Sequence, residues 1–205
     1  MSVVNVIDTL AQWVEESISP NILLKLAPPP EADETGNYDY QLVHPAVFPM
    51  YVPTQEKLPP GVHSEVPSIC VRFVKGADSV TERSGTMDVQ LCLSAWNPGL
   101  HGRDILIPLE DGRCEPWNEL ESKTFFRKSS DGWRDVYNAL DTALRAVEST
   151  DCIGPYTVDK SVPVEYGPLT EQETIPDRYP LWFAWIQFRV TFPLRRNNPE
   201  IEQYL

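Results

Sequence analysis

The stretch 181–194 places the strongest constraint on the fold of this chain. Its even-numbered residues are all apolar: Trp182, Ala184, Ile186, Phe188, Val190, Phe192 and Leu194. Its odd-numbered residues divide into an apolar half (Leu181, Phe183, Trp185) and a polar half (Gln187, Arg189, Thr191). Because successive side chains of a β-strand point to opposite faces, this alternation predicts a long strand whose even face is buried against helices. The apolar side chains of the odd face must be shielded from water by a further element.

Two earlier runs alternate in the same way and predict a β-hairpin over residues 68–96. The first run contains Ile69, Val71 and Phe73, and the second contains Met87, Val89, Leu91, Leu93 and Ala95. The polar stretch 75–85, with Gly76 and Gly85 in it, is typical of a long hairpin loop. A shorter alternation of Val162, Val164 and Tyr166 predicts a strand that joins the stretch 181–194 in a C-terminal strand pair over residues 160–195.

Two segments have helical periodicity. In residues 1–19, helical spacing places Val4, Ile7, Ala11, Val14 and Ile18 in one row and Val6, Leu10 and Trp13 in the next. In residues 130–149, one stripe contains Trp133, Val136, Tyr137, Leu140, Leu144 and Val147. A neighbouring row of this main helix carries Arg134 and Arg145. Such a charged row is either a solvated face or a subunit contact.

Proline is concentrated in residues 20–67, which hold ten of the twenty prolines of the chain. Pro28, Pro29 and Pro30 exclude a helix and favour an extended linker. Phe48 and Tyr51 are apolar residues within this stretch, so it is interpreted as an N-terminal arm that lies on its own domain or on a neighbour. A second irregular stretch, the insertion 97–129, starts at a turn and carries Trp117 and Phe125 in a charged setting.

These elements together predict one domain over residues 1–205 with an α+β fold. The expected architecture is an antiparallel sheet of four or slightly more strands, with the helices packed on one face and the proline-rich arm added at the N-terminal side. A chain of 205 residues is of ordinary size for a single domain.

The net charge of −13 argues against nucleic acid as a main partner, because Lys and Arg must neutralise phosphates for such binding. The longest unbroken apolar run, residues 181–186, is far shorter than the about 20 residues that cross a bilayer. The N-terminal stretch also lacks the basic and apolar regions of a secretory signal. We therefore expect a protein without a membrane partner.

Catalytic chemistry has little support in the sequence. His44, His63 and His101 follow no metal-binding or catalytic spacing, and the four cysteines contain no CxxC pair. Nucleophile elbows, P-loops and dinucleotide-binding glycine turns are absent from the sequence as well. We expect no catalytic residue, no cofactor and no metal, and reduced, mostly packed cysteines. The protein is therefore predicted not to be an enzyme.

Surplus apolar and aromatic surface is the more informative feature, since exposed aromatic patches are typical of protein interfaces. The alternative is that the N-terminal helix and the arm cover the second face of their own sheet. An interface with a partner and this coverage within the subunit are compatible with each other. The candidate interface residues are Trp13, Phe48, Tyr51, Trp117, Phe125, Arg134, Arg145, Phe183 and Trp185.

Two stretches carry a resemblance to a known family. Residues 131–140 (DGWRDVYNAL) resemble the start of the central helix in the tail-terminator, or tail-completion, proteins of long-tailed bacteriophages. Residues 179–186 (YPLWFAWI) resemble the start of the last strand of that family. The resemblance covers residues 68–194 and also includes the order of hairpin, helix and strand pair. It implies a virion protein of the tail or neck, assembled in the host cytoplasm.

The resemblance further implies a homo-oligomeric ring, typically a hexamer, at the head-proximal end of the tail tube. The ring would end tube polymerisation and join the tail to the head. Its partners would be other copies of itself, the tail-tube protein and a head–tail connector protein, with DNA only as passing cargo. Two alternatives stay open: another neck, connector or tail-tube component, and a non-enzymatic intracellular adaptor that binds one partner without forming a ring.

Overall fold

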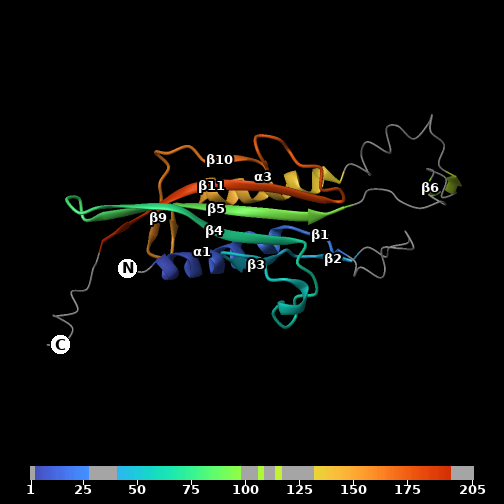
Figure 1. Ribbon diagram of the computed structural model, residues 1–205, viewed down its shortest axis with the longest axis horizontal. Coiled ribbons are helices and arrows are strands. Elements are labelled where there is room, and N and C mark those ends of the chain that lie inside the picture. Colours follow the sequence, from blue (N-terminus) through green and yellow to red (C-terminus); the bar gives the residue numbers. More distant parts are fainter. Residues whose placement is uncertain (1–2, 28–40, 98–105, 109–113, 117–131, 195–205) are drawn as a thin grey trace.

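The computed structural model describes residues 3–27, 41–97, 106–108, 114–116 and 132–194. The fold is α+β, as expected: two helices and a mixed, curved sheet of seven strands in the order β3-β4-β5-β11-β9-β8, with β10 also paired to β11 (Figure 1). The helices are α1 (Val3–Ser17) and α3 (Trp133–Ser149). The strands of this sheet are β3 (Ala46–Pro49), β4 (Ser68–Ser79), β5 (Ser84–Trp96), β8 (Cys152–Ile153), β9 (Tyr156–Val158), β10 (Glu165–Pro168) and β11 (Leu181–Pro193).

The centre of the sheet is the antiparallel pair of β5 and β11. These strands pair along their whole length, from Leu181 opposite Trp96 to Pro193 opposite Ser84. The predicted long strand is therefore confirmed. Its buried face is also the predicted one, since Ala184, Ile186, Phe188 and Val190 are all buried.

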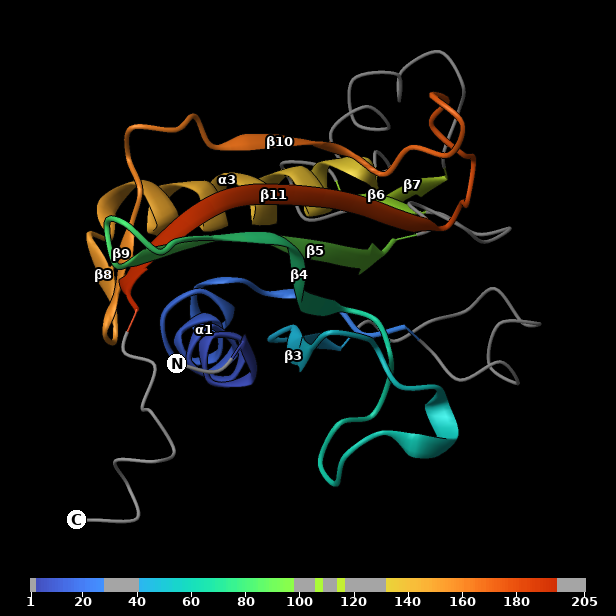
Figure 2. The ribbon, with the colours of Figure 1, turned by 60° about the vertical axis from the view of Figure 1, so that its left-hand side comes forward.

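Both helices bury their apolar sides in one core cluster that also contains the even face of β11. Helix α1 contributes Val6, Ile7, Leu10 and Val14, and helix α3 contributes Val136, Ala139, Leu140, Ala143 and Val147. Figure 2 shows α1 beside β4 and β3, and α3 beside β11. The two helices thus cover different parts of one face of the sheet, α1 over β3 and β4 and α3 over β5 and β11.

The prediction of a purely antiparallel, roughly four-stranded sheet is wrong. Strand β3 pairs in parallel with β4, with Val47 opposite Ile69 and Phe48 opposite Cys70. The parallel edge arises because residues 50–67 return the chain to the end of the sheet at which β3 began, so that Ser68 starts β4 opposite Ala46. Proline content in this stretch suggested irregular structure, but Val47 and Phe48 alternate and can pack on both faces of the sheet edge.

A separate proline-rich arm is not confirmed. The described part of residues 20–67 contributes the edge strand β3, a small sheet of β1 (Leu24–Lys25) and β2 (Leu42–Val43), and two short 3-10 helices, η1 (Ser19–Asn21) and η3 (Gln55–Lys57). Ile22 and Leu24 belong to the main core. These residues are integrated in the domain because apolar side chains between the prolines are buried by it.

The hairpin has longer strands and a shorter turn than predicted. Strands β4 and β5 remain paired out to Ser79 and Ser84, so only residues 80–83 form the turn, in place of the expected loop 75–85. Gly85 does not mark a turn but a close contact, since a Cβ there would lie 2.4 Å from the ring of Phe192. The polar residues of the stretch are compatible with a strand because β4 is exposed beyond Val71.

Within the insertion 97–129, the structure describes two short strands, β6 (Leu106–Pro108) and β7 (Cys114–Pro116), which pair with each other in antiparallel orientation. Among the described residues, neither helix has the length and apolar character needed to cross a membrane.

Candidate interaction surfaces

Two of the predicted interface residues have roles inside the domain. Trp13 packs against the core cluster and meets Phe188 in an edge-to-face contact with 6.4 Å between the ring centroids. Phe48 is buried, with 4% of its surface exposed, at the sheet edge formed by β3. The wide apolar side of the first helix is therefore used within the subunit; Phe48 is not available as an exposed interface, and Trp13 is half-buried against the core.

Phe183 and Trp185 lie on the face of the sheet that is turned away from the helices, and both are half-buried. The indole Nε1 of Trp185 donates a hydrogen bond of 2.8 Å to the carbonyl of Pro168, the last residue of β10. Its ring also lies on Gly167, where a Cβ would be 3.5 Å from the indole. Strand β10 thus supplies part of the cover that the apolar half of this face required.

The remaining candidates lie at the surface or outside the described residues. Tyr51 is 67% exposed. Arg134 lies over the ring of Trp133, 4.6 Å from its centroid, and Arg145 folds back onto its own helix by donating to the carbonyl of Asp141. Trp117 and Phe125 fall outside the part of the chain that the structure describes.

A residue that the sequence marked only as a turn, Asn97, joins four segments of the domain. Its side-chain amide donates to Asp135 Oδ2 at 2.7 Å, and its side-chain oxygen accepts from Lys25 Nζ at 2.9 Å. Its backbone N–H donates to the carbonyl of Pro180, and its carbonyl accepts from Trp182 Nε1 at 2.9 Å. Asn97 is only 4% exposed, so these bonds satisfy a buried polar group. We call this set of contacts the Asn97 junction.

The Asn97 junction brings together the two sequence stretches that carried the resemblance. Gly132 and Asp135 come from the first stretch, and Pro180 and Trp182 from the second. A Cβ at Gly132 would lie 2.2 Å from the carbonyl oxygen of Asn97 and 2.6 Å from Trp182 Nε1, so glycine is required for this close approach. Both stretches therefore have a packing role at one point of the fold.

The electrostatics of the junction depend on burial. Partial burial lowers the pKa of Lys25, and the nearby carboxylate of Asp135 acts in the opposite direction. Lys25 and Asp135 are 110 positions apart in the sequence, and no local pattern relates them. Lys25 and Asn97 are therefore not predictable as partners from the sequence, although Asn97, Pro98 and Gly99 form a turn signal at the start of the insertion 97–129.

An apolar groove lies next to the junction, between the first turns of α3 and the connection from β10 to β11. It encloses a cavity of about 300 Å³. Its walls include Trp133, Tyr137, Leu169, Ile175, Trp182 and Phe183. Ile175 is 69% exposed and Trp133 is 40% exposed. The groove therefore carries two large apolar side chains that are exposed.

A second apolar surface lies at the far end of the β4–β5 hairpin, which Figure 1 shows extending away from the helices. Val80, in the turn, has 79% of its surface accessible, and Phe73 and Val74 are exposed six to seven residues earlier, in the middle of β4. The polar stretch 75–85 predicts a turn in this region, but its composition gives no sign of the exposed apolar residues around it. We call residues 72–83 the hairpin tip.

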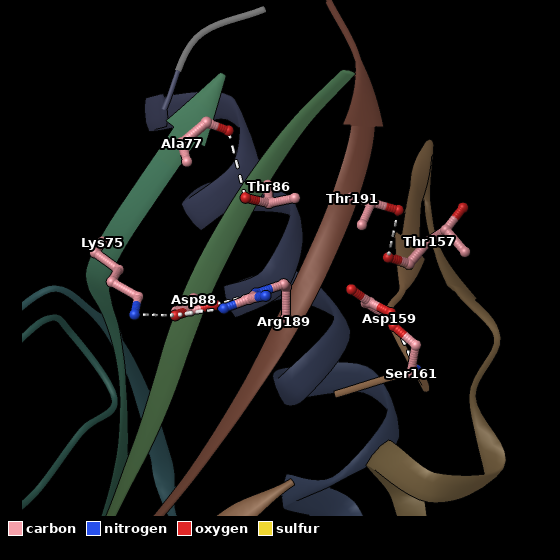
Figure 3. A network of polar contacts seen from close by, with 9 residues as sticks. All are labelled: Lys75, Ala77, Thr86, Asp88, Thr157, Asp159, Ser161, Arg189 and Thr191. Carbon is pink, nitrogen blue, oxygen red and sulfur yellow. Dashed lines mark hydrogen bonds and ion pairs between the residues drawn. The ribbon is translucent and has the colours of Figure 1, made fainter. Parts of the chain in front are cut away.

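The sheet face turned away from α1 carries an ionic cluster, shown in Figure 3. Asp88 accepts hydrogen bonds from Arg189 at 2.6 and 3.2 Å, and its Oδ2 lies 3.3 Å from Lys75 Nζ. These contacts join the three central strands of the sheet. The hydrogen bond from Arg189 lowers the pKa of Asp88 most, Lys75 lowers it further, and burial opposes both effects.

This cluster predicts a pH dependence of stability. The folded-state pKa of Asp88 lies below its unfolded value of about 3.9, so its contribution is present above that value and is lost as the pH falls through the folded-state pKa. We expect Asp88→Asn to lose less unfolding free energy than the wild type between pH 7 and about pH 2 in urea titrations. Asp141→Asn, on the exposed side of α3, is the control and should keep the wild-type acid sensitivity.

Two thiols in the middle of the sheet, those of Cys70 and Cys92, are poorly suited to nucleophilic chemistry. Cys70 and Cys92 lie opposite each other on β4 and β5. Burial raises the pKa of Cys92 to about 11 and also raises the pKa of Cys70, so both stay protonated near neutral pH. Within the described ranges, no group of three His, Cys, Asp or Glu residues could hold a metal ion.

Comparison of the sequence with protein-family models and with curated proteins finds no match.

Proposed function

We propose that the protein forms a ring at the head-proximal end of a phage tail, where it ends tail-tube polymerisation and joins the tail to the head. The observation that carries this proposal is the Asn97 junction. The two stretches that resemble the tail-terminator family are 48 positions apart in the sequence but meet there through Gly132 and Trp182. Both stretches thus help to build one point of the fold, where helix α3 packs on strand β11.

The surfaces of the domain also support a ring. A ring needs a heterologous interface, in which two different patches of each subunit meet. The domain has two separate exposed apolar surfaces, the groove beside α3 and the hairpin tip. The net charge of −13 suits a ring through which DNA passes without binding, since acidic surfaces repel phosphate.

The proposal is tested by adding the purified protein to the polymerising tail-tube protein of the phage whose genome carries this sequence. We expect tubes that stop growing at one end and carry a ring there, visible by electron microscopy, and an oligomer of the 23.3 kDa chain by light scattering. A protein that stays monomeric with tube protein present and leaves tube length unchanged would instead favour the adaptor alternative.

A further inference from the structure

The groove beside α3 is lined by apolar side chains from the helix, from β11 and from the connection between β10 and β11. Its cavity of about 300 Å³ is at the small end of ligand pockets. The walls include four aromatic rings, those of Trp133, Tyr137, Trp182 and Phe183. The connection adds the aliphatic side chains of Leu169 and Ile175. The groove therefore has the size and the walls to hold one or two aromatic side chains.

The rim of the groove is acidic along this connection. Residues 169–178 contain three acidic residues and one basic residue, Glu171, Glu173, Asp177 and Arg178, so their net charge is −2. The basic residue, Arg178, pairs with Glu171. On the wall formed by α3, the charges of the neighbours Arg134 and Asp135 cancel. An occupant of the groove should thus combine aromatic side chains with positive charge.

One stretch of this chain, residues 122–130 (SKTFFRKSS), has both properties. It contains two adjacent aromatic residues, Phe125 and Phe126. It also contains three basic residues, Lys123, Arg127 and Lys128, and no acidic residue. Its net charge is therefore +3, in a chain whose total is −13. The nearest acidic residues lie just outside it, at positions 121 and 131.

The chain brings this stretch to the groove. Residues 117–131 lie outside the described ranges, and the described chain resumes at Gly132. A Cβ at Gly132 would be 2.6 Å from Nε1 of Trp182, so this residue lies directly at the groove wall. Phe126 precedes Gly132 by six positions, which corresponds to at most about 20 Å of extended chain. Phe125 and Phe126 are therefore within reach of the groove of their own subunit.

We propose that Phe125 and Phe126 occupy the groove of the same chain, with the basic residues beside them facing the acidic connection 169–178. Apolar burial drives the contact and the opposite charges orient it. The short tether selects the subunit's own stretch over that of another copy, because a segment on a short flexible linker has an effective concentration in the millimolar range. This contact lies within one subunit, so it goes beyond the proposed function and its test does not need a ring. A neighbouring copy at this place would contact the outer side of the docked stretch.

The first test is digestion of the full chain with chymotrypsin, which cleaves after aromatic residues. Docking shields the bonds after Phe125 and Phe126. The variant Ile175→Lys places a positive charge in the groove and should raise the rate of cleavage at these two bonds at least about tenfold, as measured by mass spectrometry. Ile175 is 69% exposed, so the variant should fold like the wild type. The control Leu42→Lys alters a residue that is 57% exposed and lies outside the groove, and it should leave the rate unchanged. Equal rates in Ile175→Lys and the wild type would overturn the proposal.

The second test identifies whose groove the stretch occupies. The variant Phe126→Cys/Ile175→Cys, made in a background with Cys114→Ser and Cys152→Ser, is treated with oxidised glutathione. We expect a disulfide within one chain, formed at a rate that does not depend on protein concentration, and none in the control pair Phe126→Cys/Leu42→Cys. Disulfides between chains would overturn the contact within the subunit and assign the stretch to the groove of a neighbouring copy. Equal capture by the control pair would also overturn the proposal, because it would show contact without selectivity for the groove.

Discussion

Replacing Gly132 by alanine is expected to lower the free energy of unfolding by about 3 kcal/mol. The added Cβ would lie 2.2 Å from the carbonyl oxygen of Asn97 and 2.6 Å from Trp182 Nε1. The first of these atoms belongs to the backbone at the end of β5, so it cannot move aside as the end of a flexible side chain does. Helix α3 must therefore shift away from the sheet, which weakens the junction and widens the groove.

Local backbone preference cannot explain such a loss. Gly132 immediately precedes α3 and has φ of −56° and ψ of −27°, a region of backbone conformation that alanine adopts without strain. The matched control is Gly167→Ala in β10, where the nearest atom would be 3.5 Å away, an ordinary contact. Urea unfolding should show little change for Gly167→Ala. Equal stability of Gly132→Ala and the wild type would contradict the close contact at the junction.

The parts of the fold that sequence predicted are those where one element shows its own periodicity. The even face of β11 is apolar from Trp182 to Phe192, and a strand with that pattern must turn this face to a core. Helix α3 is also recognisable from its stripe, in which Val136, Leu140 and Val147 are buried. In both cases the signal lies within the element and does not depend on its neighbours.

The missed features depend on partners that are distant in sequence. Strand β3 has four residues among prolines, and only its pairing with β4 makes it a strand. Gly85 was interpreted as a loop residue, whereas it provides space for the ring of Phe192, which is 107 positions further along the chain. Local composition cannot distinguish a glycine that allows a turn from a glycine that allows close packing.

The candidate surfaces show the same limit. Aromatic residues such as Trp13 and Phe48 were reasonable interface candidates by residue type, but both are used inside the subunit. Conversely, Ile175 and Val80 occur in polar surroundings in the sequence and are among the more exposed apolar residues of the described structure. Residue type predicts the tendency of a side chain to be buried. The arrangement of the elements decides whether another element packs on that side chain.

A two-step truncation of Trp182 is expected to separate the packing of the junction from its hydrogen bond. Trp182→Phe removes the Nε1 donor to Asn97 and keeps most of the ring, so the loss of unfolding free energy should be about 1 kcal/mol. Trp182→Ala also removes the ring from the groove wall and should cost about 3 kcal/mol. Urea unfolding of both variants measures the two contributions.

The same variants test whether Gly132 and Trp182 act as one unit. In the double variant Gly132→Ala/Trp182→Phe, the indole nitrogen that the new Cβ would approach at 2.6 Å is gone, so part of the clash is relieved. The combined loss should therefore be smaller than the sum of the two single losses, by at least about 0.5 kcal/mol. Strict additivity would mean that the two residues do not share a contact, and the physical link between the two resembling stretches would then be removed. A non-additive result would show that Gly132 and Trp182 share one contact beside the groove.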